Sequence, residues 1–258
     1  MTRKLVMIHG MWGGAWCWEN YRPFFEERGW ETLAPTLRYH DHPPSEAPPS
    51  ELATTSLLDY AADLEAFIRG LPSAPVLMGH SMGGLLVQIL ASRGLGRAAV
   101  LLTPASPAGI LALRPSVIRS FARVLTRPGF WKKTSLPTYP SMVYSMAHLM
   151  PEEDRKAVYE RLVPESGRAT FEIGLWPLDR RHASRVDASS VKIPMLVVGG
   201  IDDKITPSGI SRQVAKKYGA DFQTFEKQAH WVLGQPGWNK VAESVSTWLD
   251  ETLESDAV

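Results

Sequence analysis

The sequence predicts an α/β protein in which helices cover both faces of a doubly wound, mostly parallel sheet, and three observations lead to this prediction. Short apolar runs alternate along the chain with longer amphipathic ones, as they do in successive βα units. Most of the short runs are almost continuously apolar, which is typical of strands buried on both faces. Between about residues 106 and 187 the alternation stops and prolines separate several helical stretches, so we expect a helical insertion there.

The individual elements follow from local patterns. Each predicted strand is a short run of apolar residues next to turn-forming residues. The strands are expected at residues 5–8, 31–34, 76–78, 98–102 and 195–198, with a further strand-like run at 222–225. Helices are expected at 56–68, where apolar residues recur at helical spacing, at 85–92 after a glycine-rich turn, and at 237–253. Thr206 and Pro207 are expected to cap and begin one more helix.

Composition and charge exclude several classes of protein. Hydrophobic residues make up 44% of the 258 residues and charged residues 21%, which excludes an intrinsically disordered chain. The net charge of +1 gives no indication of a nucleic-acid partner. The apolar stretches fall well short of the roughly 20 residues that span a bilayer, and no secretion signal precedes the first strand. We therefore expect a cytoplasmic protein without a membrane span, whose oligomeric state the sequence leaves open.

The clearest chemical signal is residues 79–83, with the sequence GHSMG. This segment fits the pattern G-x-S-x-G and lies between a predicted strand and a predicted helix, so Ser81 is expected on a sharp strand-to-helix turn. The glycines let neighbouring backbone approach the turn. The N-terminus of the following helix offers N–H groups to developing negative charge. Ser81 is therefore a candidate nucleophile.

A serine nucleophile needs a general base, and the base needs a carboxylate that orients it. Asp202 and Asp203 follow the strand at 195–198, and His230 follows the run at 222–225. Adjacent side chains on an extended segment point in opposite directions, so only one of the two aspartates is expected to reach His230. The order along the chain is Ser, Asp, His.

In these features the chain resembles the α/β-hydrolase superfamily of the serine esterase type, over nearly its whole length. Its start, with His9, Gly10 and the glycines and tryptophans of residues 11–16, is similar to the oxyanion loop of small plant-type esterases and hydroxynitrile lyases. The family's two leading antiparallel strands have no room before residue 5, so a sheet of about six strands is implied. The resemblance also implies that residues 1–105 and 188–258 form the core and that 106–187 form a helical lid, or cap.

The resemblance further assigns roles to individual residues. Ser81 would be the nucleophile, His230 the base and Asp203 the carboxylate. The backbone N–H groups of Met11 and Met82 would form the oxyanion hole. No cofactor and no metal is implied.

Several other polar residues are expected to be structural. His9 is expected to hold the oxyanion loop through hydrogen bonds and not to transfer a proton. His40 and His42 could suggest a metal pair, but they lie in a proline-rich loop without a third ligand at suitable spacing. Cys17 is expected to be a packed thiol.

The insertion contains two features that bear on specificity. Residues 106–150 carry six basic and no acidic side chains, and Arg119, Arg123 and Arg127 recur at every fourth position of its first helix. This basic face is expected either to be solvated, with the opposite apolar face (Val117, Ile118, Phe121, Val124, Leu125) covering the pocket, or to contact an anionic substrate or surface. Soft and aromatic side chains are candidates for the substrate pocket, namely Trp12, Met142, Met146, Trp176 and Trp231.

The function expected from these residues is hydrolysis of carboxylic esters of small to medium, largely apolar molecules through an acyl-enzyme intermediate. A thioesterase or a carbon–carbon bond hydrolase would use the same residues and stays open. A ligand-sensing receptor of the same fold with slow turnover also stays open. A cyanohydrin lyase is disfavoured, because those enzymes carry a lysine directly after the catalytic histidine and Trp231 stands there.

Overall fold

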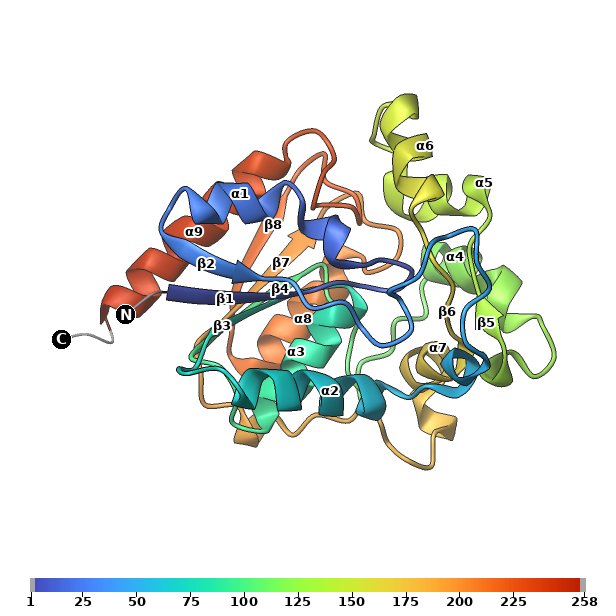
Figure 1. Ribbon diagram of the computed structural model, residues 1–258, viewed down its shortest axis with the longest axis horizontal. Helices are drawn as coiled ribbons and strands as arrows, with labels where there is room; N and C mark the ends of the chain where they lie inside the picture. The colour runs from blue at the N-terminus through green and yellow to red at the C-terminus, as the bar shows by residue number, and fades with distance from the viewer. Residues whose placement is uncertain (1–2, 256–258) are drawn as a thin grey trace.

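The computed structural model describes residues 3–255 and contains a six-stranded sheet with the strand order β2-β1-β3-β4-β7-β8 within that range (Figure 1). All five neighbouring pairs of strands are parallel. The strands are β1 (Arg3–Ile8), β2 (Trp30–Leu33), β3 (Val76–His80), β4 (Ala98–Leu102), β7 (Met195–Gly200) and β8 (Asp221–Phe225). The predicted fold class, a doubly wound sheet of about six strands, is therefore confirmed.

Helices cover both faces of this sheet. Figure 1 shows α1 and α9 on one face and α2, α3 and α8 on the other. Each layer encloses its own hydrophobic cluster, as the near-continuous apolar strands predict. The helices are α1 (Tyr21–Glu26), α2 (Leu57–Arg69), α3 (Met82–Ser92), α4 (Pro115–Leu125), α5 (Tyr139–Met142), α6 (Glu152–Glu160), α7 (Gly167–Gly174), α8 (Ser208–Tyr218) and α9 (Trp238–Ser255).

Helix α2 shows how local sequence sets an element's start. The Ser56 hydroxyl accepts a hydrogen bond from the Leu58 N–H at 3.2 Å, and the Asp59 carboxylate accepts one from the Ser56 N–H at 2.8 Å. This capping box satisfies two amide groups that the first turn leaves unpaired. The predicted apolar face is buried except for Phe67, which is 39% exposed at its edge.

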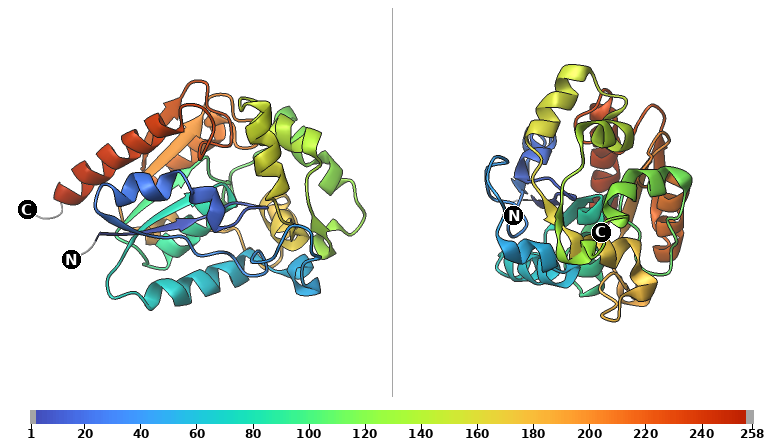
Figure 2. Two further views of the ribbon diagram at one scale, coloured as in Figure 1. Left: turned by 45° about the horizontal axis from the view of Figure 1, so that its top comes forward. Right: turned by 90° about the vertical axis from the view of Figure 1, so that its right-hand side faces the viewer.

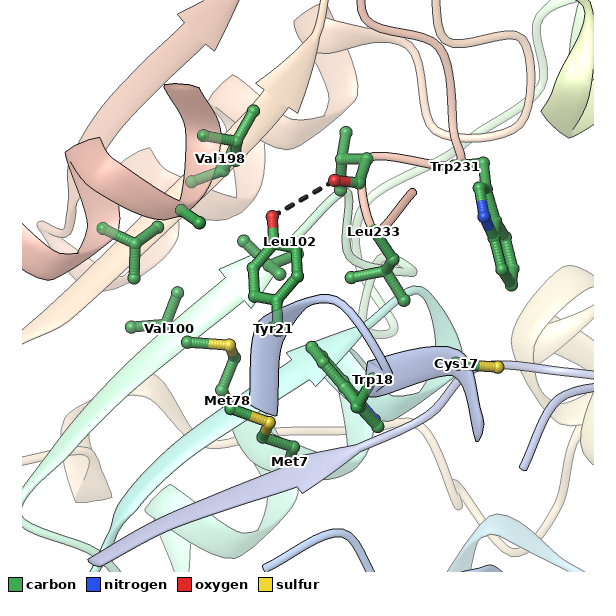
Figure 3. Close-up of a cluster of buried hydrophobic side chains, with 14 of the residues drawn as sticks. Met7, Cys17, Trp18, Tyr21, Met78, Val100, Leu102, Val198, Trp231 and Leu233 are labelled. Carbon is green, nitrogen blue, oxygen red and sulfur yellow. Dashed lines mark hydrogen bonds between the residues drawn. The ribbon is translucent and has the colours of Figure 1, made fainter. Parts of the chain in front are cut away.

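The hydrophobic cluster between the sheet and α1 anchors the loop that carries His230. Figure 3 shows Trp18 and Tyr21 packed on Met7, Met78 and Leu102 of three neighbouring strands. The Tyr21 hydroxyl donates a hydrogen bond of 3.1 Å to the Val232 carbonyl, which anchors the chain two residues after His230. The hydrophobic core therefore extends to the edge of the sheet where the candidate residues lie.

Residues 106–187 connect β4 to β7 and contain α4 to α7. A short antiparallel pair, β5 (Thr134–Ser135) and β6 (Glu165–Ser166), lies among these helices. The left view in Figure 2 shows this green-to-gold segment at the end of the molecule where the parallel strands terminate, and in the right view the same segment faces the viewer. Parallel α/β sheets bind ligands at the carboxyl ends of their strands, so the segment covers the side on which a site is expected. No helix in residues 3–255 is long and apolar enough to cross a membrane.

Candidate active site

Ser81 lies on a strained turn between β3 and α3. Its backbone has φ 53° and ψ −118°, a left-handed conformation that costs about 1–3 kcal/mol for a residue with a side chain. Backbone hydrogen bonds hold it in place: the Ser81 N–H donates to the Leu102 carbonyl at 3.0 Å, and the Ala105 N–H donates to the Ser81 carbonyl at 2.9 Å. Both partners lie at or just after the end of β4, so the neighbouring strand fixes the position of the Ser81 side chain.

The glycines around Ser81 are required by close backbone contacts. A Cβ atom on Gly79 would lie 2.3 Å from the Gly83 carbonyl oxygen, and one on Gly83 would lie 2.1 Å from the Ile8 carbonyl oxygen. Both distances are far below van der Waals contact. The G-x-S-x-G pattern therefore follows from packing of this turn against itself and against the end of β1.

Ser81, His230 and Asp203 form a continuous chain of hydrogen bonds. His230 Nε2 lies 2.9 Å from Ser81 Oγ, and His230 Nδ1 lies 2.8 Å from Asp203 Oδ2. A carboxylate only accepts hydrogen bonds, so Nδ1 carries the proton and Nε2 accepts from the serine hydroxyl. The His230 carbonyl accepts hydrogen bonds from His80 Nε2 at 2.9 Å and Thr103 Oγ1 at 3.3 Å. These two bonds fix the backbone of the loop that carries His230.

The structure brings Asp203, and not Asp202, to the histidine. Asp203 is buried, and its Oδ1 accepts hydrogen bonds from the backbone N–H groups of Ile205 at 2.7 Å and Thr206 at 2.9 Å. Burial opposes the negative charge, but attraction to His230 and these hydrogen bonds outweigh it and lower the pKa of Asp203. Asp202 is exposed and contributes its backbone N–H to the Gln228 carbonyl at 3.0 Å.

The predicted cap of the following helix is wrong, and Thr206 contributes to the site instead. Helix α8 begins at Ser208 with Pro207 as its N-cap residue, one position later than expected. The Thr206 hydroxyl lies 2.7 Å from Asp203 Oδ2 and 3.0 Å from the Thr103 carbonyl oxygen. The hydroxyl thus braces the carboxylate and does not cap the helix. A threonine followed by a proline looks the same in the sequence in either role.

The loop after β1 lies against the nucleophile. His9 Nε2 accepts a hydrogen bond from the Leu37 N–H at 3.0 Å, and its Nδ1 donates to the Gly10 carbonyl at 2.8 Å. Burial, followed by the charge of His40, lowers the pKa of His9 to about 3. His9 is therefore a neutral brace of this loop, in the place where the sequence analysis expects one. Met11 and Met82 both line the cavity beside Ser81, and Met82, the first residue of α3, has an N–H without an intrahelical partner.

A cavity of about 860 Å³, including its open mouth, begins at Ser81. Helix α4 forms one wall with four side chains of its predicted apolar face: Val117, Ile118, Phe121 and Leu125. The remaining wall is also mostly apolar, and among residues 3–255 it includes no charged side chain. Its polar side chains are Ser81, Ser106, Thr170 and Thr206. Such a cavity is suited to an uncharged, apolar group.

Of the five side chains expected in the pocket, the structure places Trp176 on the cavity wall and the other four elsewhere. Met142 and Met146 are buried in the core cluster that contains α1 and α9, because they turn inward from α5 and the π-helical turn Val143–Ala147. The Trp231 ring packs on Trp16 with ring centres 5.7 Å apart. Trp12 lines a second, smaller cavity.

That second cavity, of about 360 Å³, shares two wall residues with the first. Phe121 and Ile205 line both cavities, and the Trp12 ring stacks on Phe121 with ring centres 6.1 Å apart. The Trp12 indole N–H donates a hydrogen bond of 3.0 Å to the Ser135 carbonyl. The aromatic character of Trp12 predicts a place in the substrate pocket, but tertiary packing puts its ring on the far side of Phe121, in the second cavity.

The basic face of α4 is shorter than expected. Arg119 and Arg123 are exposed on the helix, whereas Arg127 lies beyond the helix end at Leu125. The Arg119 guanidinium stacks on the Tyr144 ring at 3.9 Å, and Lys204 Nζ lies 4.5 Å from the centre of the same ring. The two cations therefore share one aromatic side chain near the cavity.

The other candidates from the sequence have structural environments. Cys17 is buried, and burial raises the pKa of its thiol to about 12, so it is unreactive as a thiolate. His40 contacts Glu165 and not His42. In the part of the chain that the structure describes, no three His, Cys, Asp or Glu side chains converge as metal ligands would.

The chain is similar in sequence to known hydrolases and esterases. A pyrethroid hydrolase of Sphingobium wenxiniae is 21% identical over 272 residues, which cover 97% of this chain and 89% of that protein. Methylesterase 8 of Arabidopsis thaliana is 28% identical over 148 residues, which cover 54% of this chain and 50% of that protein.

Solved structures share the fold at low identity. A methylesterase from Arabidopsis superposes with a TM-score of 0.73 at 16% identity, covering 96% of this chain and 99% of that one. Tomato methylketone synthase I, solved with 2-tridecanone, gives the same TM-score and identity over 98% and 99% of the two chains. The model of the alpha/beta hydrolase family matches residues 5–238. The chain therefore belongs to the alpha/beta hydrolase family.

Proposed function

We propose that the protein is a serine hydrolase that cleaves carboxylic esters of small to medium, largely apolar molecules. The observation that carries the proposal is the hydrogen-bonded chain from Ser81 through His230 to Asp203, which opens directly into the apolar cavity. The relatives named as a pyrethroid hydrolase and a methylesterase support an ester as the substrate.

The proposed reaction assigns each step to particular residues. Ser81 Oγ attacks the ester carbonyl carbon while His230 Nε2 takes the hydroxyl proton. Asp203, ionised and held by two backbone N–H groups, keeps the His230 ring in the tautomer that accepts at Nε2. The backbone N–H groups of Met11 and Met82 stabilise the tetrahedral oxyanion. His230 then protonates the leaving alcohol, and water activated by the same nitrogen releases the acyl group.

Residues 106–187 act in this proposal as a cap on a core formed by residues 1–105 and 188–258. The cap supplies the apolar wall of α4, so it selects the substrate while the core carries out the chemistry. The charge-free cavity wall favours an uncharged group near Ser81. Arg119 and Lys204, which flank Tyr144, offer a place for an anionic group on the part of the substrate that stays outside.

The proposal is tested with p-nitrophenyl esters from acetate to dodecanoate. We expect activity to peak at short or medium acyl chains and to disappear in Ser81→Ala. A fluorophosphonate probe should add covalently to the wild type at Ser81, as mass spectrometry would detect, and not to the variant. Parallel assays with acyl-thioesters and with β-diketones distinguish a thioesterase or a carbon–carbon bond hydrolase. An intact fold that labels at Ser81 but turns over none of these substrates would indicate a receptor instead.

A further inference from the structure

A buried pair of opposite charges joins the proposed cap to the core beside the oxyanion loop. Glu165 of β6 and His40, in the loop after β2, both have fully buried side chains, and His40 Nε2 lies 3.1 Å from Glu165 Oε2. Glu165 Oε1 accepts hydrogen bonds from the Tyr60 hydroxyl at 2.8 Å and the Ser166 N–H at 2.6 Å. The carboxylate therefore has a partner on both oxygens.

The hydrogen-bond partners of His40 define its protonation state. Its Nδ1 lies 3.0 Å from the Arg38 carbonyl oxygen, and its Nε2 faces the Glu165 carboxylate. A carbonyl and an ionised carboxylate only accept hydrogen bonds, and attraction to His40 lowers the pKa of Glu165, so both ring nitrogens donate and His40 is an imidazolium. Burial alone would lower the pKa of His40, but attraction to Glu165 outweighs it and holds the pKa above the ordinary value.

The neighbouring His9 is neutral for the opposite reason. Its Nε2 accepts from a backbone N–H while its Nδ1 donates to a carbonyl, so it carries one ring proton. The rings of His9 and His40 are 5.4 Å apart. The two histidines therefore form one unit, with the positive charge fixed on His40.

A short turn connects this unit to the nucleophile. The His40 N–H donates to the Leu37 carbonyl at 3.1 Å, and Tyr39 inside the turn has φ 64°, a left-handed conformation unfavourable for tyrosine. The Leu37 N–H in turn holds His9, which holds the Gly10 carbonyl. Gly10 lies so close to Ser81 that an added Cβ would be 2.9 Å from the serine Cβ. Met11, whose backbone N–H is the proposed oxyanion donor, directly follows Gly10, so a shift of Gly10 would also move this N–H.

We propose that His40 and Glu165 are positioning residues, whose opposite charges hold the turn at residues 37–40 and, through His9, place the Met11 amide for oxyanion binding. This inference rests on the proposed esterase function for its kinetic consequences. It implies that catalysis needs His40 protonated as well as His230 unprotonated, so kcat should fall at alkaline pH.

Among the described residues of this cluster, His40 is the one expected to lose its charge as the pH rises, because attraction to Glu165 raises its pKa. His9, at the end of β1, is already neutral above about pH 3. Tyr60 of α2 stays protonated, because burial and then Glu165 raise the pKa of its hydroxyl. The Glu165 pKa is lowered, since attraction to His40 outweighs burial. Arg38 points outward and pairs with Asp63 of α2.

The chain offers a matched control in Glu172 of α7. Its carboxylate is also fully buried and also joins the cap to the core, accepting from the Ser56 hydroxyl at 2.8 Å and the Leu57 N–H at 2.8 Å. The hydrogen bonds of this carboxylate go to Ser56, Leu57 and Arg168, outside the turn at residues 37–40. Glu172→Gln therefore tests general loosening of the cap, whereas Glu165→Gln also removes the charge that His40 requires.

The experiment measures kcat and KM between pH 6 and 10 for the wild type, both single variants and the double variant His40→Gln with Glu165→Gln. We expect Glu165→Gln to lower kcat by about 10- to 100-fold, less than full loss of an oxyanion donor, with KM within about threefold. Glu172→Gln should change kcat less than about threefold. The double variant replaces the ion pair by two amides that can hydrogen-bond, so it should recover most of kcat and lose the alkaline fall.

A second measurement does not depend on turnover. Hydrogen–deuterium exchange of the peptide containing Gly10 and Met11, at one fixed pH, should be faster in Glu165→Gln than in the wild type and unchanged in Glu172→Gln. Equal effects of the two single variants on kcat and on exchange, or an alkaline fall that persists in the double variant, would overturn the inference. A wild type that hydrolyses no ester would refute the proposed function alone, and the exchange data would then decide on the coupling.

Discussion

The turn that carries Ser81 and helix α4, which faces it across the cavity, are held by different forces. The turn is fixed by backbone hydrogen bonds to the end of β4 and by glycines that touch neighbouring carbonyl groups. Helix α4 has a single buried side chain, Val124, which is still 9% exposed, while Ile118 on the cavity wall is 49% exposed. The chemistry therefore depends on backbone geometry that tolerates few substitutions, whereas the fit to substrate depends on apolar side chains that can change without loss of the fold.

The largest expected effect tests the chemical side of this contrast. Asp203→Asn should lower kcat by about 10³- to 10⁴-fold, because an amide in place of the carboxylate no longer selects the productive tautomer of His230. Asp202→Asn, a change of the same kind on the exposed neighbour, should cost about tenfold at most. Steady-state kinetics with one ester measures both. A dead Asp202 variant beside a nearly normal Asp203 variant would mean that His230 is oriented differently from the geometry described.

A substitution of glycine should break the turn through the backbone. Gly83→Ala would place a Cβ 2.1 Å from the Ile8 carbonyl oxygen, so we expect the free energy of unfolding to fall by about 1–3 kcal/mol, with a loss of activity as β1 and the oxyanion loop shift. Gly209→Ala is the matched control, because a Cβ there meets nothing within 4 Å in the first turn of α8. It should be neutral or stabilise by up to about 0.5–1 kcal/mol. Urea denaturation of the two variants gives the comparison.

The same contrast explains what could be predicted from the sequence. Backbone-determined features have short, local signals: the five predicted strands and the strand-like run at 222–225 correspond to the six strands of the sheet, and GHSMG forms the Ser81 turn. The contact between Asp203 and His230 follows from their places after adjacent strands β7 and β8. Features made by tertiary packing have no such signal. Met142 and Met146 have the composition of pocket residues but turn into the core, since periodicity does not say which neighbour a helix faces.

Long-range polar contacts could not be predicted from the sequence either. Glu165 lies 125 residues from His40, and nothing near either residue indicates the pairing.

Two local features were also missed. The helix at 21–26 was not predicted, because α1 is short and carries Pro23. The brace that Thr206 provides to Asp203 had the same local pattern as a helix cap.

On the cap side, we expect Phe121→Ala to change selectivity more than rate. Its ring forms part of the wall between the 860 Å³ cavity and the 360 Å³ cavity, so removing it should join the two. The ratio of kcat/KM for octanoate to that for acetate should rise about tenfold, as expected when several methylene groups gain an apolar site. Val117→Ala is the control, since Val117 lines the larger cavity alone and its truncation joins nothing. Equal selectivity changes in both variants would argue against Phe121 as the partition.

The smallest expected effect concerns the charges outside the cavity. Reversing Arg119 and Arg123 to glutamate should raise KM for an ester with an anionic leaving group about threefold at low salt, because exposed charges act through a screened field. A neutral ester should be unaffected, and the difference should shrink as salt is added. The matched control reverses Arg212 and Lys216, which have the same spacing on α8, where Arg212 also stacks on an aromatic ring, that of Phe222. If both pairs of reversals act alike, the effect is one of net charge. A specific response to the α4 pair would instead place the anionic end of the substrate beside Tyr144.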